Sequence, residues 1–288
     1  MKAVTPVSGG QSSAYIAANY PSDFLVFALV CIEDRNCTPK DAGLVQEVSD
    51  RIGREFIATA EDDTILQTML DLEQYLGQRI DWVTGPTFEE VIRKKNGFLP
   101  SPLRRYCTVQ MKMYPLFEWQ RNHCNLAEGE IVRQQIGFRH GESKRASNML
   151  ERCVDGVMSI KAVVGKTKDG RNKWADIPYQ MPAFPLIDNG IRKSDIVQFW
   201  KGKPVRFAQR NNCVGCFNQN PLLLRKRWQD NPVKMEWFAK QERERTRPND
   251  LWNVHDYGIS YDDMRKRHAQ HELTFEDFAD CDSGYCGI

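Results

Sequence analysis

Apolar and polar positions along the first third of the chain predict strands and helices in alternation. A continuous apolar run, FLVFALVCI at 24–32, has the length of a strand that is buried on both faces. Apolar residues then recur at helical spacing over 43–56 and over 64–76. A short strand is predicted at 80–83, followed by a helix that begins near Thr87, where TFEE has the spacing of a capping box.

The rest of the chain adds a strand, a hairpin and a helical region. A strand is predicted at 131–138, and a β-hairpin or exposed insertion at 154–174, whose centre is polar and contains glycine. Beyond residue 210 the sequence becomes charged and helix-rich. We therefore expect an α/β protein in which a Rossmann-like parallel-sheet domain occupies 1–210. Residues 211–288 would form a helical, cysteine-bearing cap and tail that covers the ligand edge of the sheet.

The segment SGGQSS lies between the first apolar stretch, at 3–7, and a helical run that starts near residue 14. Glycine tolerates positive φ and lets a ligand approach the backbone, while the start of a helix offers free N–H groups and a partial positive charge. Such a loop is also common as a plain turn, so this motif alone leaves both readings open. The candidate phosphate-binding residues are Ser8, Gly9, Gly10, Ser12 and Ser13.

Composition indicates an ordinary globular protein of 288 residues, with 41% hydrophobic and 27% charged residues. The longest apolar run is too short to cross a bilayer, and the N-terminal residues do not resemble a signal peptide, so we expect a cytoplasmic protein without a membrane segment. A formal charge of +2 does not by itself demand nucleic acid. Nine cysteines in such a protein favour metal binding or thiol chemistry over disulfides.

The cysteine pair CVGC, Cys213 and Cys216, has the spacing that lets two thiolates bind one metal centre. One pair needs further ligands, for which Cys107, Cys281 and Cys286 are candidates. Soft thiolates suit zinc or an iron–sulfur cluster, and the spacing alone leaves both open.

Two basic segments provide candidate anion-binding groups. In GFRHGESKR, Arg139 and Arg145 flank Glu142 just past a predicted strand, where arginines can grip sulfate or phosphate oxygens and the carboxylate can orient an arginine. A salt-bridged surface turn is the alternative. In RRYCTVQMK, cations surround Cys107, and we expect them to favour its thiolate form. These cations are Arg104, Arg105 and Lys112.

The order of SGGQSS, RRYCTVQMK (104–112), GFRHGESKR (137–145) and FPLID (184–188) resembles the phosphoadenosine phosphosulfate (PAPS) reductase family of PP-loop proteins. The resemblance implies an adenine nucleotide α-hydrolase-like fold. It implies a thiol-dependent oxidoreductase of sulfate assimilation that reduces PAPS, or adenylyl sulfate (APS), to sulfite. A cysteine S-sulfo intermediate and a thioredoxin or glutaredoxin-type thiol donor belong to this reaction.

Similarity to the iron–sulfur APS reductases implies a 4Fe-4S cluster near the site. The implied ligands are Cys107, Cys213, Cys216 and Cys281. This assignment leaves Cys286 as the catalytic nucleophile, whereas the rival assignment makes Cys286 the fourth ligand. Lys112 keeps the family's position beside the cluster and, with Arg139, completes the implied catalytic set. The tail differs from the family's, because Tyr285 precedes Cys286 where relatives have glutamate.

The loop also departs from the pattern, because ATP-cleaving relatives have an aspartate where this chain has Ser12. The departure favours a reductase. The alternative is an ATP-dependent PP-loop sulfurtransferase that thiolates tRNA or DNA, with Mg²⁺ bound by carboxylates such as Glu33 and Asp34. Nucleic acid is expected as a partner only under that alternative, and a third reading is a nucleotide-binding redox sensor. The choice between PAPS and APS stays open, as does a homodimeric assembly.

Overall fold

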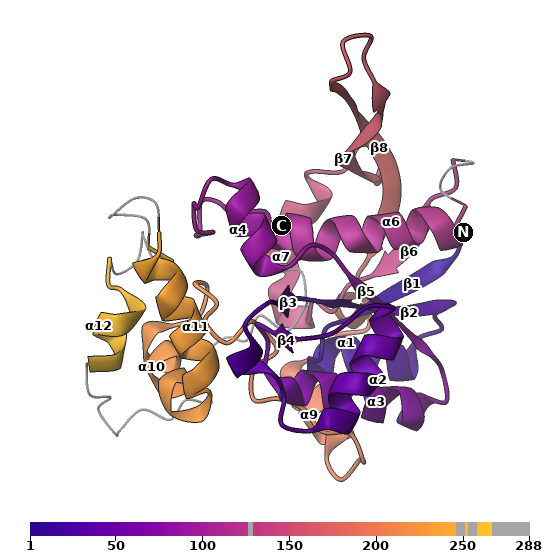
Figure 1. The fold of residues 1–288 in the computed structure, drawn as a ribbon. Helices are drawn as coiled ribbons and strands as arrows, with labels where there is room; N and C mark the ends of the chain where they lie inside the picture. Colours follow the sequence, from indigo (N-terminus) through magenta and orange to yellow (C-terminus); the bar gives the residue numbers. More distant parts are fainter. Residues whose placement is uncertain (126–128, 246–250, 253–257, 267–288) are drawn as a thin grey trace.

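A computed structural model describes residues 1–125, 129–245, 251–252 and 258–266. The described residues form a six-stranded sheet with the order β5-β2-β1-β6-β8-β7 (Figure 1). The strands are β1 (Ala3–Val7), β2 (Phe24–Leu29), β5 (Ile80–Thr84), β6 (Val132–Gln135), β7 (Met158–Lys166) and β8 (Asn172–Ala183). All neighbouring pairs are parallel except β7 and β8, which are antiparallel. The prediction of an α/β fold with a mostly parallel sheet is therefore confirmed.

Helices cover both faces of this sheet (Figure 1). One face packs against α1 (Gln11–Asn19), α2 (Ala42–Ile52), α3 (Asp63–Leu76) and α9 (Lys193–Trp200). The other packs against α6 (Tyr114–His123) and α7 (Ser143–Leu150). Alternation along β2 explains the division, since Leu25 and Phe27 face the first group while Val26 faces the second. Strand β2 is thus buried on both sides, as its apolar sequence predicts.

The apolar run at 24–32 forms two strands and not the single strand that we expected. After β2 ends at Leu29, residues Cys31–Ile32 (β3) pair antiparallel with Ala58–Thr59 (β4) in a separate two-stranded sheet. The carbonyl of Val30 accepts hydrogen bonds from the Thr59 hydroxyl, at 2.8 Å, and the Ala60 N–H, at 3.2 Å. These bonds draw the chain away from the main sheet while the side chains stay buried.

Other predicted elements agree with the structure. Thr87 caps α4 (Phe88–Lys94) with the reciprocal hydrogen bonds of a capping box. The hairpin at 154–174 is present as β7 and β8, and its second strand continues into the main sheet, which the sequence pattern did not indicate. The strand expected at 131–138 is the shorter β6.

Within the described part of the chain after residue 220, three helices lie together at one end of the molecule (Figure 1). They are α10 (Pro221–Asp230), α11 (Pro232–Arg243) and α12 (Tyr261–Lys266). Their buried tryptophans, Trp228 and Trp237, pack in one hydrophobic cluster with Phe88 and Met111 from the sheet domain. The cap therefore shares a core with the region before residue 211. Among the described residues, the helices lack the combined length and apolarity needed for a membrane span.

Candidate functional site

The strand order places a ligand-binding crevice beside β1. The chain builds β2 and β5 on one side of β1, and β6 and β8 on the other. Loops that leave the carboxyl ends of β1 and β6 therefore diverge, and open α/β sheets bind ligands at such a point. SGGQSS follows β1 and GFRHGES follows β6, so the topology brings both segments to this crevice. They are in close contact, because a Cβ on Gly137 would lie 3.4 Å from the Cβ of Ser12.

The SGGQSS loop starts α1 with unsatisfied polar groups. Gly10 is the N-cap and supplies no side chain to cap the helix, and the first intrahelical bond runs from the Ala14 N–H to the Gly10 carbonyl at 3.2 Å. The N–H groups of the first helical residues, Gln11, Ser12 and Ser13, are therefore available to an anion. The Oγ of Ser12 is buried and has no hydrogen-bond partner among the described residues. A buried polar atom of this kind is expected to find its partner in a ligand or water.

Two other serines of the loop hold its shape. The Oγ of Ser13 lies 3.2 Å from the Oγ of Ser8 and donates to the Gly10 carbonyl at 3.1 Å. The Asn211 side-chain amide donates to the Ser8 Oγ at 3.4 Å. The loop is thereby tied to the segment that precedes the CVGC motif.

Gly9 is required at its position for two physical reasons. Its φ is +77°, a region that residues with a side chain rarely adopt. A Cβ at Gly9 would also lie 2.6 Å from the Cγ2 of Ile65, a fully buried residue of α3. The loop therefore lies directly on the first helical turn of α3.

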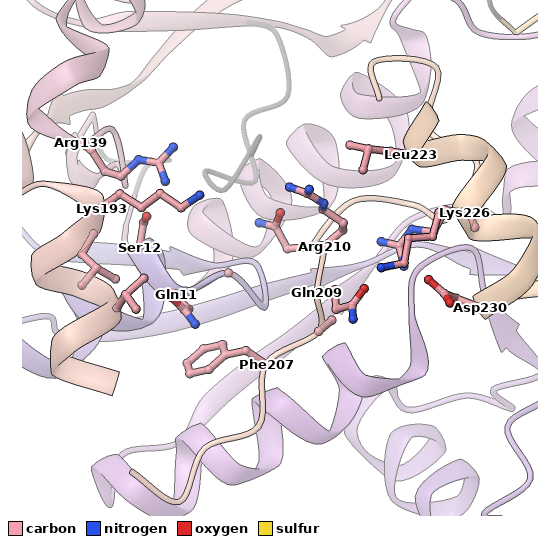
Figure 2. A pocket seen from close by; sticks show the side chains of 16 residues that line it. Gln11, Ser12, Arg139, Lys193, Phe207, Gln209, Arg210, Leu223, Lys226 and Asp230 are labelled. Carbon is pink, nitrogen blue, oxygen red and sulfur yellow. The ribbon is translucent and has the colours of Figure 1, made fainter. Parts of the chain in front are cut away.

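A cavity of about 710 Å³ opens at the start of α1. Its cationic lining residues are Arg139, Lys193, Arg210, Lys226 and Arg227. Figure 2 shows Arg139 and Lys193 on one side of the cavity, near Ser12, and Arg210 and Lys226 on the other. Among its described lining residues, Asp230 is the one carboxylate. Cations at two separated places, together with a helix N-terminus, suit a ligand with more than one anionic group.

The GFRHGES segment forms a compact ion-pair unit. Glu142 accepts from the Arg139 Nε at 3.0 Å and the Arg145 Nη1 at 2.5 Å. Burial opposes ionisation of Glu142, but the Arg139 backbone N–H and the two guanidinium charges outweigh it and lower the pKa of this carboxyl group. Arg139 lines the cavity, whereas Arg145 lies over the Phe138 ring, 4.4 Å from its centroid, and is not among the lining residues. Arg145 and Glu142 thus orient Arg139.

Cys107 lines one small cavity of about 50 Å³ with Lys112 and with Cys213 and Cys216, which lie more than a hundred residues further along the chain. Cys107 belongs to the short helix α5 (Tyr106–Thr108), and the CVGC motif is fixed by the Val214 N–H, which donates to the Ala60 carbonyl at 2.8 Å. Within the described residues, no three His, Cys, Asp or Glu side chains are grouped so that they could hold a metal ion. The two remaining candidate ligands, Cys281 and Cys286, lie outside the described residues.

Lys112 lies between the cysteine cavity and the SGGQSS loop. It belongs to the π-helical turn η2 (Val109–Met113), a distortion that is frequent at functional sites. Its Nζ donates to the Glu61 Oε1 at 2.8 Å, and the Glu61 side chain is only 1% exposed. Lys112 also lines a small cavity with Ser8 of the SGGQSS loop. One ammonium group is therefore close to both the loop and the cysteines.

The expectation that nearby cations favour the Cys107 thiolate is wrong for the protein alone. Burial raises the pKa of Cys107, and the opposing effects of Thr108 and Lys112 are smaller. The two arginines point to other partners, since Arg104 lies over the Phe98 ring and Arg105 donates to Asn218 at 2.9 Å.

Several residues of the site were not predicted from the sequence. Lys193 and Arg210 belong to no recognisable motif, and only folding brings them to the cavity. Glu61 stands beside the acidic residues that begin α3, so nothing in the sequence distinguishes it from them. Conversely, the predicted magnesium carboxylates face elsewhere: Glu33 pairs with Arg93 at 3.1 Å, and Asp34 caps a short 3₁₀-helix. Neither of these carboxylates lines the cationic cavity.

The arrangement combines a crevice lined by cations with a neighbouring group of cysteine side chains. Comparisons with protein-family models, with curated proteins and with solved structures give no match for this chain. Function is therefore inferred from the geometry of the two cavities and from the sequence motifs that form them.

Proposed function

We propose that the chain binds an adenosine sulfonucleotide, PAPS or APS, and reduces its sulfate group to sulfite by thiol chemistry. The observation that carries this proposal is the cationic cavity at the start of α1, together with a cysteine-lined cavity whose Lys112 also lines a small cavity with Ser8 of the SGGQSS loop. The motif resemblance to the PAPS reductase family supports the same substrate class.

The lining of the large cavity favours a sulfonucleotide over magnesium ATP. Phosphate oxygens would accept from the free N–H groups at the start of α1 and from the Ser12 hydroxyl, which needs a partner. Arg139, oriented by Glu142, would bind the sulfate–phosphate group. Magnesium is usually held by carboxylates together with substrate phosphates, and among the described lining residues only Asp230 supplies one.

The reaction needs two successive thiol steps. A cysteine thiolate attacks the sulfate sulfur, the bond between sulfur and the phosphate oxygen breaks, and the nucleotide leaves with that electron pair. The enzyme then carries Cys–S–SO₃⁻, as the family resemblance implies for Cys286. A dithiol donor of the thioredoxin or glutaredoxin type attacks the cysteine sulfur and releases sulfite, and its second thiol restores the enzyme thiol as the donor becomes a disulfide.

Lys112 would stabilise the negative charge of the bound substrate. Its ammonium group is held by the buried carboxylate of Glu61, so its position does not depend on the ligand. Fixed charges of this kind stabilise developing negative charge without reorganisation during the reaction.

The cysteine-lined cavity fits the donor set of an iron–sulfur cluster. Cys107, Cys213 and Cys216 would be ligands, with Cys281 or Cys286 as the fourth. In a 4Fe-4S cluster each cysteine binds a different iron, so the ligands need not converge on one atom as they do around zinc. The cluster would act by its charge on Lys112 and the substrate.

The test is anaerobic incubation of the purified chain and a thioredoxin-type dithiol donor with radiolabelled PAPS, APS or ATP. Sulfite, pyrophosphate and the nucleotide product are then measured, the last being AMP from APS and adenosine 3′,5′-bisphosphate from PAPS. Sulfite from a sulfonucleotide, lost in Cys286→Ser, is the expected result. Pyrophosphate from ATP with no sulfite from either sulfonucleotide would instead favour the thiolating sulfurtransferase. Nucleotide binding without any product would favour the redox sensor.

Matched variants test the two cavities separately. Arg210→Ala should weaken sulfonucleotide binding by roughly tenfold or more, because hydrogen bonds to charged groups contribute about 1.5–3 kcal/mol. Arg79→Ala is the control, since its side chain is 78% exposed and lies outside the cavity. Cys213→Ser should abolish iron and acid-labile sulfide, whereas Cys153→Ser should retain both because Cys153 does not line the cysteine cavity. Equal iron content in these two cysteine variants would contradict the cluster assignment.

A further inference from the structure

The hairpin of β7 and β8 extends far beyond the body of the molecule (Figure 1). We call its outer part, residues 163–174, the ribbon; every residue in it is exposed. The parallel pairing of β6 with Gln180–Ala183 places the ribbon before the part of β8 that joins the sheet. The ribbon therefore leaves from the amino end of the sheet, whereas the cationic cavity lies at the carboxyl end.

The ribbon concentrates positive charge. Its cations are Lys166, Lys168, Arg171 and Lys173, and its one carboxylate is Asp169. Its net charge of +3 exceeds the +2 of the entire chain, so the remainder of the protein is slightly acidic. None of these four cations forms a salt bridge within the described residues.

The same segment exposes apolar side chains. Trp174 is 50% exposed, Val164 is 48% exposed and Val163 is 38% exposed. Trp174 is the one aromatic among the large apolar side chains that the described residues leave exposed. A hairpin that served only as a solvated connection would need neither this tryptophan nor the neighbouring valines, since apolar groups gathered in one place usually mark an interaction surface.

We propose that the ribbon binds double-stranded DNA by entering the major groove. Two antiparallel strands lie about 5 Å apart, and a two-stranded ribbon fits a groove about 12 Å wide. Cations on both strands and on the turn then face the phosphates on either side of the groove, and Trp174 and the valines contact sugars and base edges. The pairing register of β7 and β8 shifts between Val163 and Gly165, so the ribbon is not a perfectly regular hairpin.

This function is separate from sulfonucleotide chemistry. The cavity and the ribbon lie at opposite ends of the parallel strands, so a duplex on the ribbon leaves the cavity open. The DNA would act as an anchor for the protein, not as its substrate.

The test is fluorescence anisotropy of the full chain with a fluorescein-labelled 20-base-pair DNA duplex at 50–200 mM salt. If four cations each contact a phosphate, the slope of log K against log salt is about −3.6, and binding weakens roughly 150-fold across this range. Replacing Lys166, Lys168, Arg171 and Lys173 with alanine should abolish most of this slope. The matched control replaces Lys40, Arg79, Lys94 and Lys201, which are exposed and dispersed over the surface, and should retain the slope.

The single variant Lys168→Glu changes only the turn of the ribbon, where it cannot disturb the packed core, and should weaken binding at least tenfold. Circular dichroism checks that each variant is folded. Equal affinity and slope in the two fourfold variants would overturn the proposal, as would the absence of wild-type binding at 50 mM salt. If polyglutamate competes with DNA for the ribbon and binds as tightly as DNA does, the partner of the ribbon is instead an acidic protein. That result would also overturn the proposal.

Discussion

Replacing Gly9 with alanine should destabilise the protein more than the same change at another glycine of positive φ. Gly53 is the matched control: its φ is +67°, close to the +77° of Gly9, and a Cβ there would meet nothing within 4 Å. Gly53→Ala therefore measures the backbone effect alone. A left-handed residue with a side chain costs about 1–2 kcal/mol, partly offset by about 0.4–1 kcal/mol from the stiffer unfolded chain.

Gly9→Ala adds a steric effect to that backbone effect. The new Cβ would lie 2.6 Å from the Cγ2 of Ile65, which is 0% exposed and surrounded by the core of α3. Overpacking of this kind costs about 1–3 kcal/mol. We therefore expect Gly9→Ala to lower the free energy of unfolding by about 1–3 kcal/mol more than Gly53→Ala does.

Urea unfolding followed by tryptophan fluorescence measures this difference, provided that the m-values of the variants agree. The double variant Gly9→Ala/Ile65→Ala provides a second check. Because Ile65→Ala removes the clashing methyl group, it should lower the free energy of unfolding less in the Gly9→Ala background than in the wild type. Gly9→Ala should also weaken sulfonucleotide binding, while Gly53→Ala should not. Equal destabilisation by the two glycine substitutions would refute the reasoning about the loop.

Three further predictions concern other buried contacts. Burial raises the pKa of Glu242 from 4.5 to about 7. The contribution of Glu242 to the free energy of unfolding is therefore full below pH 4.5 and falls by roughly 3 kcal/mol as the pH rises through 7. Urea titrations between pH 5 and 8 should show this dependence in the wild type and a flatter one in Glu242→Gln. Gly215→Ala should lower both the urea midpoint and the iron content, because its Cβ would meet the Phe238 ring at 2.4 Å. Lys112→Met should lower the free energy of unfolding by about 3 kcal/mol, since it leaves Glu61 buried and unpaired. Adding Glu61→Gln to this variant should recover part of that free energy in the same urea assay.

Sequence periodicity predicted most of the elements but not every connection. Helices at 64–76 and after Thr87 were recognisable because apolar spacing and capping residues act locally. The division of 24–32 was not, since it depends on hydrogen bonds to Val30 from a segment nearly thirty residues away. An apolar run indicates burial, and burial is compatible with either arrangement.

The candidate site was predictable to the extent that its residues lie in motifs. SGGQSS and GFRHGES meet at the crevice because both follow neighbouring parallel strands. The strand–helix pattern implied that each segment follows a strand, but the adjacency of the two strands comes from the fold. Lys193 and Arg210 were not predictable, since each stands in an ordinary sequence and acquires its role only when the chain folds across the crevice. The pKa of Cys107 was misjudged for a related reason: nearby charges are visible in a sequence, but the burial that outweighs them is not.

Lys112 shows why the two cavities should be considered together. A buried carboxylate is tolerated in a protein when it is paired, and Glu61 therefore holds the ammonium group in place whether or not a ligand is present. Because Lys112 lines cavities with Ser8 on one side and with Cys107 on the other, its positive charge acts on both. An anion at the SGGQSS loop, or an anionic cluster at the cysteine cavity, would each stabilise this charge and be stabilised by it. Binding at one cavity should consequently alter the affinity of the other, even though no ligand needs to bridge them.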